Sequence, residues 1–465
     1  MRNYESVLKK VLLRIKPDEL QRQRVMRTVT AAIEAMRKSI SQVDPQLEMK
    51  LEGSLAKDTW ISTDVDADVF ILFPPSYEKQ RMGDLVIEHT RKVFGAKRVG
   101  LRYAEHPYAT VKLTDADIDF VPCYRSTPPN WLSATDRTVY HTVFVNENFG
   151  ATLRDEARIL KAFLKGIGIY GAEIKVEGFS GFLSELLVLW AGGFLSALRR
   201  LSEVKMPLIV DVEGLTKAQD PAEVASAFKS EFVVIDPVDR ERNVASSVSV
   251  DNLANLVWAS RSFLAEPSES YFSQRGARRI PKRPRRWEVK LVCVRVAPWN
   301  VPPDVLWGQV HRIRRKMEGE LVKAGFRVFM SGDWTDESEE VLFLFALDGD
   351  SLPSSILHLG PSAFDYPNSE AFLARHRSDR RVVSGPYIKD GRWAVLLRRD
   401  AVKVNEILKS ALVSEEFLSG LSPEALKSFR RAKVMDNESL SHKRVTTEGL
   451  RKIAEFMAGK PKWVR

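Results

Sequence analysis

The segment that decides the fold of the N-terminal part of this chain reads Gly53-Ser-Leu-Ala-Lys-Asp-Thr-Trp60, followed after five residues by Asp66-Ala-Asp-Val-Phe-Ile-Leu-Phe73. Its second half predicts a buried strand that stops at Pro74 and begins with two aspartates two positions apart. Residues two apart in a strand share a face, so Asp66 and Asp68 are expected to project side by side. Neighbouring carboxylates raise each other's pKa unless a cation lies between them. The pair therefore indicates a metal site.

A second acidic strand follows, Asp115-Ala-Asp-Ile-Asp-Phe-Val-Pro122, and it can bring a third carboxylate to the same site. Oxygen-only ligation by three carboxylates suits Mg²⁺, and two such ions can clamp the attacking and leaving oxygens of an in-line displacement. The alternative is ordinary polar alternation at a strand edge, which two such strands and the upstream Gly53-Ser54 disfavour. Spacing alone does not select the ligands from the aspartates that share a face, which are Asp64, Asp66 and Asp68 on one strand and Asp115, Asp117 and Asp119 on the other.

Around this segment the apolar spacing predicts a mixed α/β N-terminal domain and then a helical middle domain. A segment rich in Arg, Pro, Gly and Ser, residues 268–286, reads as a basic linker and places a domain boundary there. After it, the order of expected elements is β-α-β-β-α-β, which is compatible with a split-βαβ domain. The last sixty-odd residues, from Lys403, are expected to be helical and polar.

The composition is that of an ordinary globular chain: 465 residues, 44% hydrophobic and 28% charged. Only two cysteines occur, Cys123 and Cys293, which excludes a disulfide scaffold and a thiolate zinc site and favours a reducing compartment. Lys and Arg number 71 against 61 Asp and Glu, a net charge of +10, which makes nucleic acid the leading class of partner.

No signal peptide is recognised at the N-terminus. The most apolar stretch, residues 178–198, contains Ser180, Ser184, Glu185 and Ser196. A membrane span needs about 20 mostly apolar residues, so a buried helix is expected here. The G-x-G-x-x-G pattern at 166–171 follows a helical run rather than a strand, so we interpret it as a helix end and not as a dinucleotide-binding loop.

The residues from Gly53 to Trp60, with Asp66-Ala-Asp68, resemble the signature of the DNA polymerase beta nucleotidyltransferase superfamily, in which Gly-Ser opens a turn and helix beneath a triphosphate. Within that superfamily the chain is most similar to the archaeal, class I tRNA CCA-adding enzymes. The similar blocks are Arg102–Tyr108, Asp119–Tyr124, Asp136–Thr138, Ile169–Glu173, Gly178–Gly181 and Asp236–Val244. The resemblance runs from about Pro17 to Ala265, and beyond Ser268 it rests mainly on Leu359–Pro361 and Gly391–Trp393.

The resemblance implies an α+β multidomain chain. Residues 1–150 would form a nucleotidyltransferase catalytic domain with a polymerase beta-like palm, residues 151–267 a helical central nucleotide-binding domain, and residues 268–465 a C-terminal α/β RNA-binding body with a helical tail. It also implies an enzyme that adds and repairs the 3′-terminal C-C-A of tRNA from CTP and ATP, with release of pyrophosphate.

The family's functional residues carry over by position. Asp66, Asp68 and Asp119 match the catalytic, metal-binding carboxylates, with Asp119 as the base toward the 3′-hydroxyl, and Arg242 matches an arginine that reaches the incoming base. Asp64, Asp115 and Asp117 are then bystanders. The other matched nucleotide-binding positions are Ser54, Lys57, Thr138, His141, Lys161 and Tyr170.

Contact with the acceptor and T stems of tRNA is expected in the C-terminal half, because an enzyme that accepts all tRNAs must bind their backbones. The cationic residues expected to make it are Arg275, Arg278, Arg279, Lys282, Arg283, Arg312 and Arg315; the alternative is a solvated basic face.

The remaining expectations are a two-metal Mg²⁺ site, a cytoplasmic location, no membrane, and a homodimer as one oligomeric state left open. Two other functions stay open: a poly(A) polymerase-like RNA terminal nucleotidyltransferase with the same metal site, and a non-catalytic RNA-binding relative.

Overall fold

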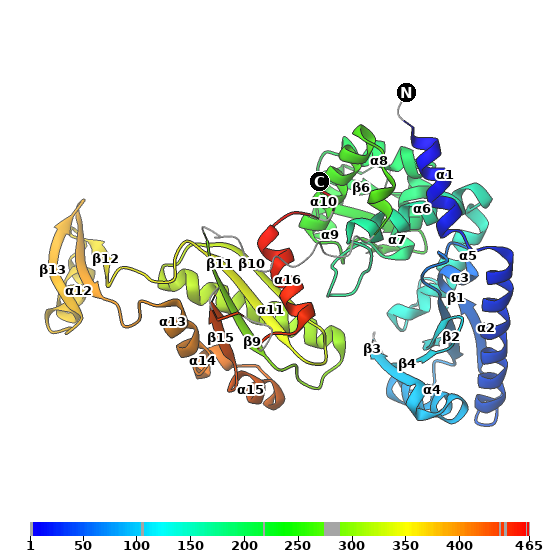
Figure 1. The fold of residues 1–465 in the computed structure, drawn as a ribbon, viewed down its shortest axis with the longest axis horizontal. Helices are drawn as coiled ribbons and strands as arrows, with labels where there is room; N and C mark the ends of the chain where they lie inside the picture. Colours follow the sequence, from blue (N-terminus) through cyan, green and yellow to red (C-terminus); the bar gives the residue numbers. More distant parts are fainter. Residues whose placement is uncertain are drawn as a thin grey trace. The chain divides into compact units, whose positions relative to one another are not determined.

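The computed structural model describes residues 3–103, 107–216, 219–273, 289–436, 439–440, 444–461 and 463–464. The chain divides into two compact units (Figure 1). Unit 1 comprises Met1–Gly276, Pro302–Asp304 and Pro461–Arg465, and unit 2 comprises Ala277–Val301 and Val305–Lys460. Unit 1 thus contains both of the first two expected domains.

A five-stranded sheet forms the N-terminal part of unit 1, with the strand order β1 (Glu48–Glu52), β2 (Asp66–Phe73), β5 (Asp117–Tyr124), β4 (Pro107–Lys112), β3 (Val99–Tyr103). Strands β2 and β5 are parallel, and the other neighbours are antiparallel. Helices α2 (Glu19–Ile40) and α4 (Lys79–Phe94) share an apolar core with one face of this sheet. Alternate residues of β2, such as Val69 and Ile71, belong to that core, so the intervening positions face the other way.

The second part of unit 1 is mainly helical and is built around the fully buried rings of Phe163, Phe194 and Phe263. Its helices are α1 (Tyr4–Ile15), α5 (Arg137–Asn148), α6 (Ala151–Ile167), α7 (Gly181–Ala191), α8 (Phe194–Ser202), α9 (Pro221–Phe228) and α10 (Val250–Ala265). Short 3-10 helices add η1 (Ala96–Arg98), η2 (Ala134–Asp136) and η3 (Glu269–Phe272) to unit 1. Helix α6 ends at Gly168, whose φ of 85° confirms that the glycine pattern ends a helix.

The middle part is mainly helical as expected, and it also contains a small sheet that was not expected, β6 (Leu208–Val210), β7 (Phe232–Asp236), β8 (Asp239–Asn243). Strand β8 has the sequence Asp-Arg-Glu-Arg-Asn, which lacks the apolar alternation that would have predicted it. The chain end returns to this unit, where Trp463 Nε1 donates to Asn255 Oδ1 of α10 at 3.3 Å.

Unit 2 contains a four-stranded sheet with the order β10 (Val328–Thr335), β11 (Val341–Leu347), β9 (Lys290–Val296), β15 (Lys433–Asp436). A separate three-stranded sheet has the order β12 (Ser355–Ser362), β14 (Arg392–Arg398), β13 (Val382–Lys389). The expected split-βαβ sheet was therefore wrong: the later strands form their own sheet, with α12 (Tyr366–Arg377) against it. The other helices are α11 (Pro303–Ala324), α13 (Val404–Ala411), α14 (Glu415–Leu418), α15 (Pro423–Phe429) and α16 (Thr447–Ala458).

Two local expectations in unit 2 have clear outcomes. The hairpin around Asp390-Gly391 is confirmed, with φ values of 48° and 73° at its two turn residues, as a tight hairpin turn requires. The segment after Lys403 is largely helical as expected, but it also supplies the edge strand β15 to the larger sheet.

Among the described residues no single helix is long and apolar enough to cross a membrane, and α7 with α8 meet that test only together, as a pair bent by 87°.

Candidate active site

The three predicted carboxylates lie on adjacent strands of the five-stranded sheet. Asp68 of β2 pairs in register with Asp119 of β5, and Asp66 pairs with Asp117. These residues alternate with Ala67 and Ile118, which belong to the core under α2 and α4. The carboxylates therefore project from the opposite face of the sheet, and the structure brings Asp66, Asp68 and Asp119 together there.

The electrostatic setting of these carboxylates opposes ionisation. Burial, and then the charges of Asp119 and Asp66, raise the pKa of Asp68 to about 7. Burial also raises the pKa values of Asp66 and Asp119. Thr110 Oγ1 donates to Asp119 Oδ1 at 2.5 Å, and Arg102 Nη1 lies 3.6 Å from the other carboxylate oxygen. A cation among these oxygens would remove the repulsion that raises the pKa values.

The turn between β1 and β2 is shaped around Asp68. Gly53 has a φ of +69°, and a Cβ added there would lie 1.9 Å from Asp68 Oδ2. Only glycine satisfies both constraints, because L side chains rarely adopt this backbone region. Ser54 lies half-buried in the short helix α3 (Gly53–Ala56) that starts at this glycine.

The donor set fits a hard divalent cation. As the side chains stand, the described residues include no group of three or more His, Cys, Asp or Glu that could hold a metal ion. Asp66, Asp68 and Asp119 nevertheless supply only carboxylate oxygens, on one face and with raised pKa values, which is the chemistry that Mg²⁺ selects.

Two lysines predicted to bind nucleotide meet at one buried carboxylate, that of Glu185 on α7. Lys57 Nζ donates to Glu185 Oε2 and Lys161 Nζ to Glu185 Oε1, both at 2.7 Å. Thr59 Oγ1 donates to Oε1 at 2.5 Å. Sequence reasoning missed Glu185 as a functional residue; the one signal available was a single acid inside an otherwise apolar helix.

His141 and Arg242 meet at a second buried carboxylate, Asp236 at the end of β7. His141 Nε2 lies 2.9 Å from Asp236 Oδ2, and Arg242 Nη1 donates to the same oxygen at 2.7 Å. The His141 ring stacks on Phe182 with centroids 4.0 Å apart, and burial lowers the pKa of His141. Thr138 lies half-buried one turn earlier on α5. Asp236 opens the sequence block that also holds Arg242, six residues later, but it was not singled out because its other partner, His141, is 95 residues away in the chain.

Tyr170 lies near the lysine pair but makes different contacts. An added Cβ at Gly181 would lie 3.1 Å from Tyr170 Oη and 3.7 Å from Lys161 Nζ. The ammonium of Lys165 lies 4.8 Å from the centre of the Tyr170 ring and pairs with Asp64. Burial raises the pKa of Tyr170, so its hydroxyl stays protonated.

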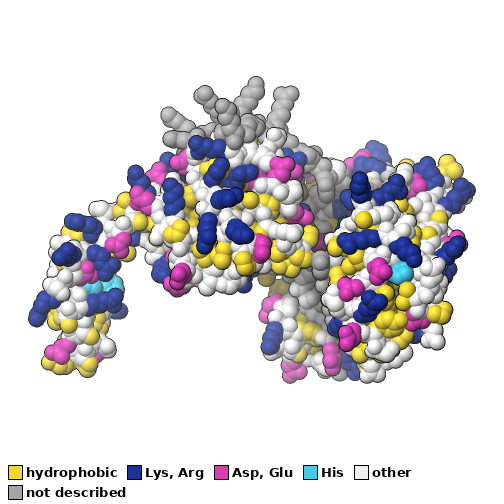
Figure 2. All heavy atoms as spheres, turned by 90° about the horizontal axis from the view of Figure 1, so that it is seen from below, with side chains coloured by type: hydrophobic (Ala, Val, Ile, Leu, Met, Phe, Trp, Pro, Cys, Tyr) yellow, Lys and Arg dark blue, Asp and Glu magenta, His cyan; other side chains and the backbone are white. Residues whose placement is uncertain are grey.

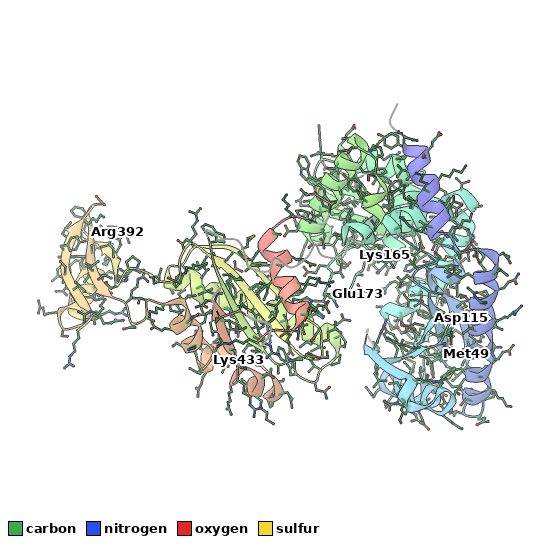
Figure 3. All side chains as sticks on the ribbon, viewed as in Figure 1. Met49, Asp115, Lys165, Glu173, Arg392 and Lys433 are labelled. Carbon is green, nitrogen blue, oxygen red and sulfur yellow. The ribbon has the colours of Figure 1, made fainter. Side chains whose placement is uncertain are left out.

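Two of the aspartates interpreted as bystanders have structural partners. Asp64 pairs with Lys165 of α6, and Asp115 Oδ2 accepts a hydrogen bond from Thr28 Oγ1 of α2 at 3.0 Å. Figure 3 labels Lys165 and, beside α2, Asp115.

Of the expected RNA-binding residues, Arg312 and Arg315 lie exposed on α11. Arg312 Nη2 donates to the carbonyl oxygen of Gly420 at 3.1 Å. The other five, Arg275, Arg278, Arg279, Lys282 and Arg283, lie outside the described residues.

Three family models match successive parts of the chain: "Nucleotidyltransferase domain" at residues 33–141, "tRNA nucleotidyltransferase, second domain" at 155–273, and "CCA-adding enzyme, C-terminal domain" at 289–422. The CCA-adding enzyme of Pyrobaculum islandicum is 34% identical over 417 residues, which cover 89% of this chain and 94% of that protein. The chain belongs to the CCA-adding enzyme family. The CCA-adding enzyme of Methanothermobacter thermautotrophicus is 32% identical over 438 residues, covering 91% and 93% of the two chains.

Membership of the CCA-adding enzyme family confirms the resemblance that the sequence indicated, and with it a tRNA nucleotidyltransferase of the α+β multidomain class with an N-terminal nucleotidyltransferase domain. A solved structure of the Cid1 poly(U) polymerase with Mg and 3′-dATP bound is 13% identical, with a TM-score of 0.44 over 58% of this chain and 98% of that chain.

Proposed function

We propose that this enzyme builds and repairs the 3′-terminal C-C-A of tRNA from CTP and ATP, one nucleotide at a time and without a nucleic-acid template. The observation that carries the proposal is the in-register pair Asp68 and Asp119, set against the Gly53 turn, in a chain that matches CCA-adding enzymes along nearly its whole length.

In the proposed reaction the 3′-hydroxyl of the tRNA attacks the α-phosphorus of the nucleotide. A bond forms between that oxygen and phosphorus, the bond from the α-phosphorus to the bridging oxygen breaks, and pyrophosphate leaves. Asp119, held by Thr110, accepts the hydroxyl proton. When bound by Asp66, Asp68 and Asp119, Mg²⁺ would supply Lewis-acid stabilisation of the charge that develops on the phosphoryl oxygens.

The nucleotide is proposed to lie between the sheet and the helical part of unit 1. Lys57 and Lys161 would bind the triphosphate, together with the hydroxyl of Ser54. Arg242 is 39% exposed although its guanidinium touches the buried Asp236, so part of this side chain is accessible to a base edge. The remaining proposed contacts with the nucleotide's phosphates and sugar are those of Thr138, His141 and Tyr170.

The tRNA is proposed to bind through its acceptor and T stems, by phosphate contacts that do not read sequence. The net charge of +10 supports this. In the view of Figure 2, lysine and arginine side chains lie on both units. Arg312 and Arg315 of α11 are the proposed contacts within the described part of the chain.

Incubation with a tRNA that lacks its C-C-A, with one labelled nucleotide at a time, tests the proposal. CTP alone should add two residues and stop, and ATP alone should add none. An open-ended tail from ATP alone would support a poly(A) polymerase-like enzyme instead. A lack of any Mg²⁺-dependent incorporation would support a non-catalytic RNA-binding relative.

A further inference from the structure

The cluster around Glu185 is enclosed and carries an unbalanced charge. The exposed fractions of Glu185, Lys161 and Lys57 are 0%, 2% and 5%. Two ammonium groups share the carboxylate of Glu185 at 2.7 Å each. The charges of Asp68 and Glu52 also act on Lys57, but Asp68 is one of the three carboxylates that would hold a cation. Two buried ammonium groups on one carboxylate therefore favour an anion that binds beside them.

The contacts fix the directions of both lysines. Each lysine donates to a different oxygen of Glu185, so both ammonium groups are held against the same carboxylate. Thr59 Oγ1 accepts from Lys161 Nζ at 2.8 Å while it donates to Glu185. The Lys57 ammonium also lies 5.2 Å from the centre of the Phe182 ring, the ring on which His141 stacks.

Three segments distant in sequence meet at this carboxylate. Lys57 follows α3 of the Gly53 turn, Lys161 lies in the middle of α6, and Glu185 lies on α7. Because one carboxylate joins the turn to the helical part, its position sets the distance between the two phosphate-binding cations. The charges of Lys161 and Lys57 also hold the pKa of Glu185 down at about 2, although burial acts in the opposite direction.

We propose that Glu185 is a positioning residue for the incoming nucleotide: it is the fixed counter-ion that holds Lys57 and Lys161 together and aimed at the β- and γ-phosphates. This inference rests on the proposed function of the same site and adds a residue to which no nucleotide contact is assigned. In this proposal Glu185 supports the two lysines and does not itself bind the nucleotide, because its carboxylate is an anion, fully buried and bonded to Lys57, Lys161 and Thr59.

The experiment compares the equilibrium binding of ATP and of AMP to the full-length enzyme and to Glu185→Gln. Glutamine keeps the shape of the Glu185 side chain but removes its negative charge. The two buried ammonium groups then have no counter-ion, and one of them loses its proton. ATP binding should weaken about tenfold, the value of one hydrogen bond to a charged group, and AMP binding should change less than about twofold because AMP lacks the β- and γ-phosphates. In turnover, KM should rise similarly for CTP and ATP, with a much smaller change in kcat.

Glu340→Gln is the matched control. Glu340 is also fully buried and pairs with a cation, Arg295, at 2.7 Å, but it lies in unit 2 and belongs to no nucleotide site. It should leave both ATP and AMP binding unchanged. Glu185→Asp restores the charge and should recover part of the ATP affinity.

Three results for folded Glu185→Gln would overturn the proposal: unchanged affinity for ATP, an equal loss of affinity for ATP and for AMP, or a higher affinity for ATP. The last result would mean that Glu185 competes with the phosphates for the lysines. If Glu185→Gln does not fold, Thr59→Val, which removes only a hydroxyl, should weaken ATP more than AMP, and equal effects would count against the proposal. Because binding needs no turnover, a wild-type enzyme that fails to add C-C-A would refute the proposed function and still leave this inference testable.

Discussion

Replacing Gly53 by alanine tests whether the turn and the catalytic carboxylate are fitted to each other. The new methyl carbon would lie 1.9 Å from Asp68 Oδ2, whereas real Cβ atoms essentially never come closer than 3.0 Å. The difference, 3.0 minus 1.9, requires a movement of about 1 Å by the carboxylate or by the turn. A misplacement of about 1 Å in an active site can lower the rate about a hundredfold.

The stability cost should be much smaller than the catalytic cost. An alanine at positive φ costs about 1–2 kcal/mol, and a side chain forced off its rotamer adds about 0.5–1.5 kcal/mol. Gly53→Ala should therefore fold, with a free energy of unfolding lowered by about 2–3 kcal/mol, while the rates of C addition and of A addition fall together by about a hundredfold.

Gly95→Ala provides the matched control. Gly95 has a φ of +83°, and in the described part of the chain nothing lies within 4 Å of an added Cβ, so an alanine there also has a strained backbone but meets no collision. Single-turnover rates at saturating CTP or ATP, with urea denaturation of both variants, check the prediction. Near-normal rates for Gly53→Ala, with a stability loss equal to that of Gly95→Ala, would refute the reasoning.

Three further predictions follow from the structure. Asp68→Asn and Asp119→Asn should each lower the rates of C addition and of A addition by about a thousandfold or more, because several kcal/mol of charge stabilisation depend on these carboxylates. Asp64→Ala, measured in the same primer-extension assay, should stay active. A folded Asp119→Asn enzyme with normal turnover would remove that residue from the mechanism. Arg242→Ala should raise KM for CTP and ATP and increase UTP or GTP incorporation, and unchanged fidelity with unchanged KM would count against a role at the base. His376 is 3% exposed, and among the described residues its ring nitrogens have no hydrogen-bond partner, with the Asp379 carboxylate 3.8 Å from Nδ1. Burial lowers its pKa, so the unfolded state binds the proton more tightly, and stability should fall as pH drops below about 6.5. The variant His376→Phe should lose less stability between pH 7 and pH 5 in urea denaturation, and an equal loss would contradict this account.

The two strands that carry the carboxylates were predictable because their signals are local. Asp66 to Phe73 combines a carboxylate pair with an unbroken apolar run, and the second acidic strand was expected to bring a third carboxylate to the same site. The register of β2 with β5 comes from the structure. The helices under the sheet were predictable for the same reason, since Val25, Val29 and Met36 recur at helical spacing and are all buried.

What the sequence could not predict depends on contacts between distant segments. Glu185 is separated by 128 residues from Lys57 and by 24 from Lys161, so its apolar helix indicates burial but not its partners. The hairpin of β13 and β14 was expected in the larger sheet, because strand order along a chain does not state which strands pair, and β12, which joins it in a separate sheet, was not expected as a strand. Strand β8 was not predicted either, because its polar residues show no alternation of apolar and polar positions.

The sequence of the 3′ end made by the wild-type enzyme tests the central claim most directly. A tRNA transcript that lacks its C-C-A is incubated with all four nucleoside triphosphates and Mg²⁺, and the products are sequenced. The three carboxylates alone would permit any tail, whereas a CCA-adding enzyme selects both nucleotide and length. We expect one product, which ends in C-C-A and is not extended further. Tails of other sequence, tails that continue beyond the terminal A, or an unextended transcript would contradict it.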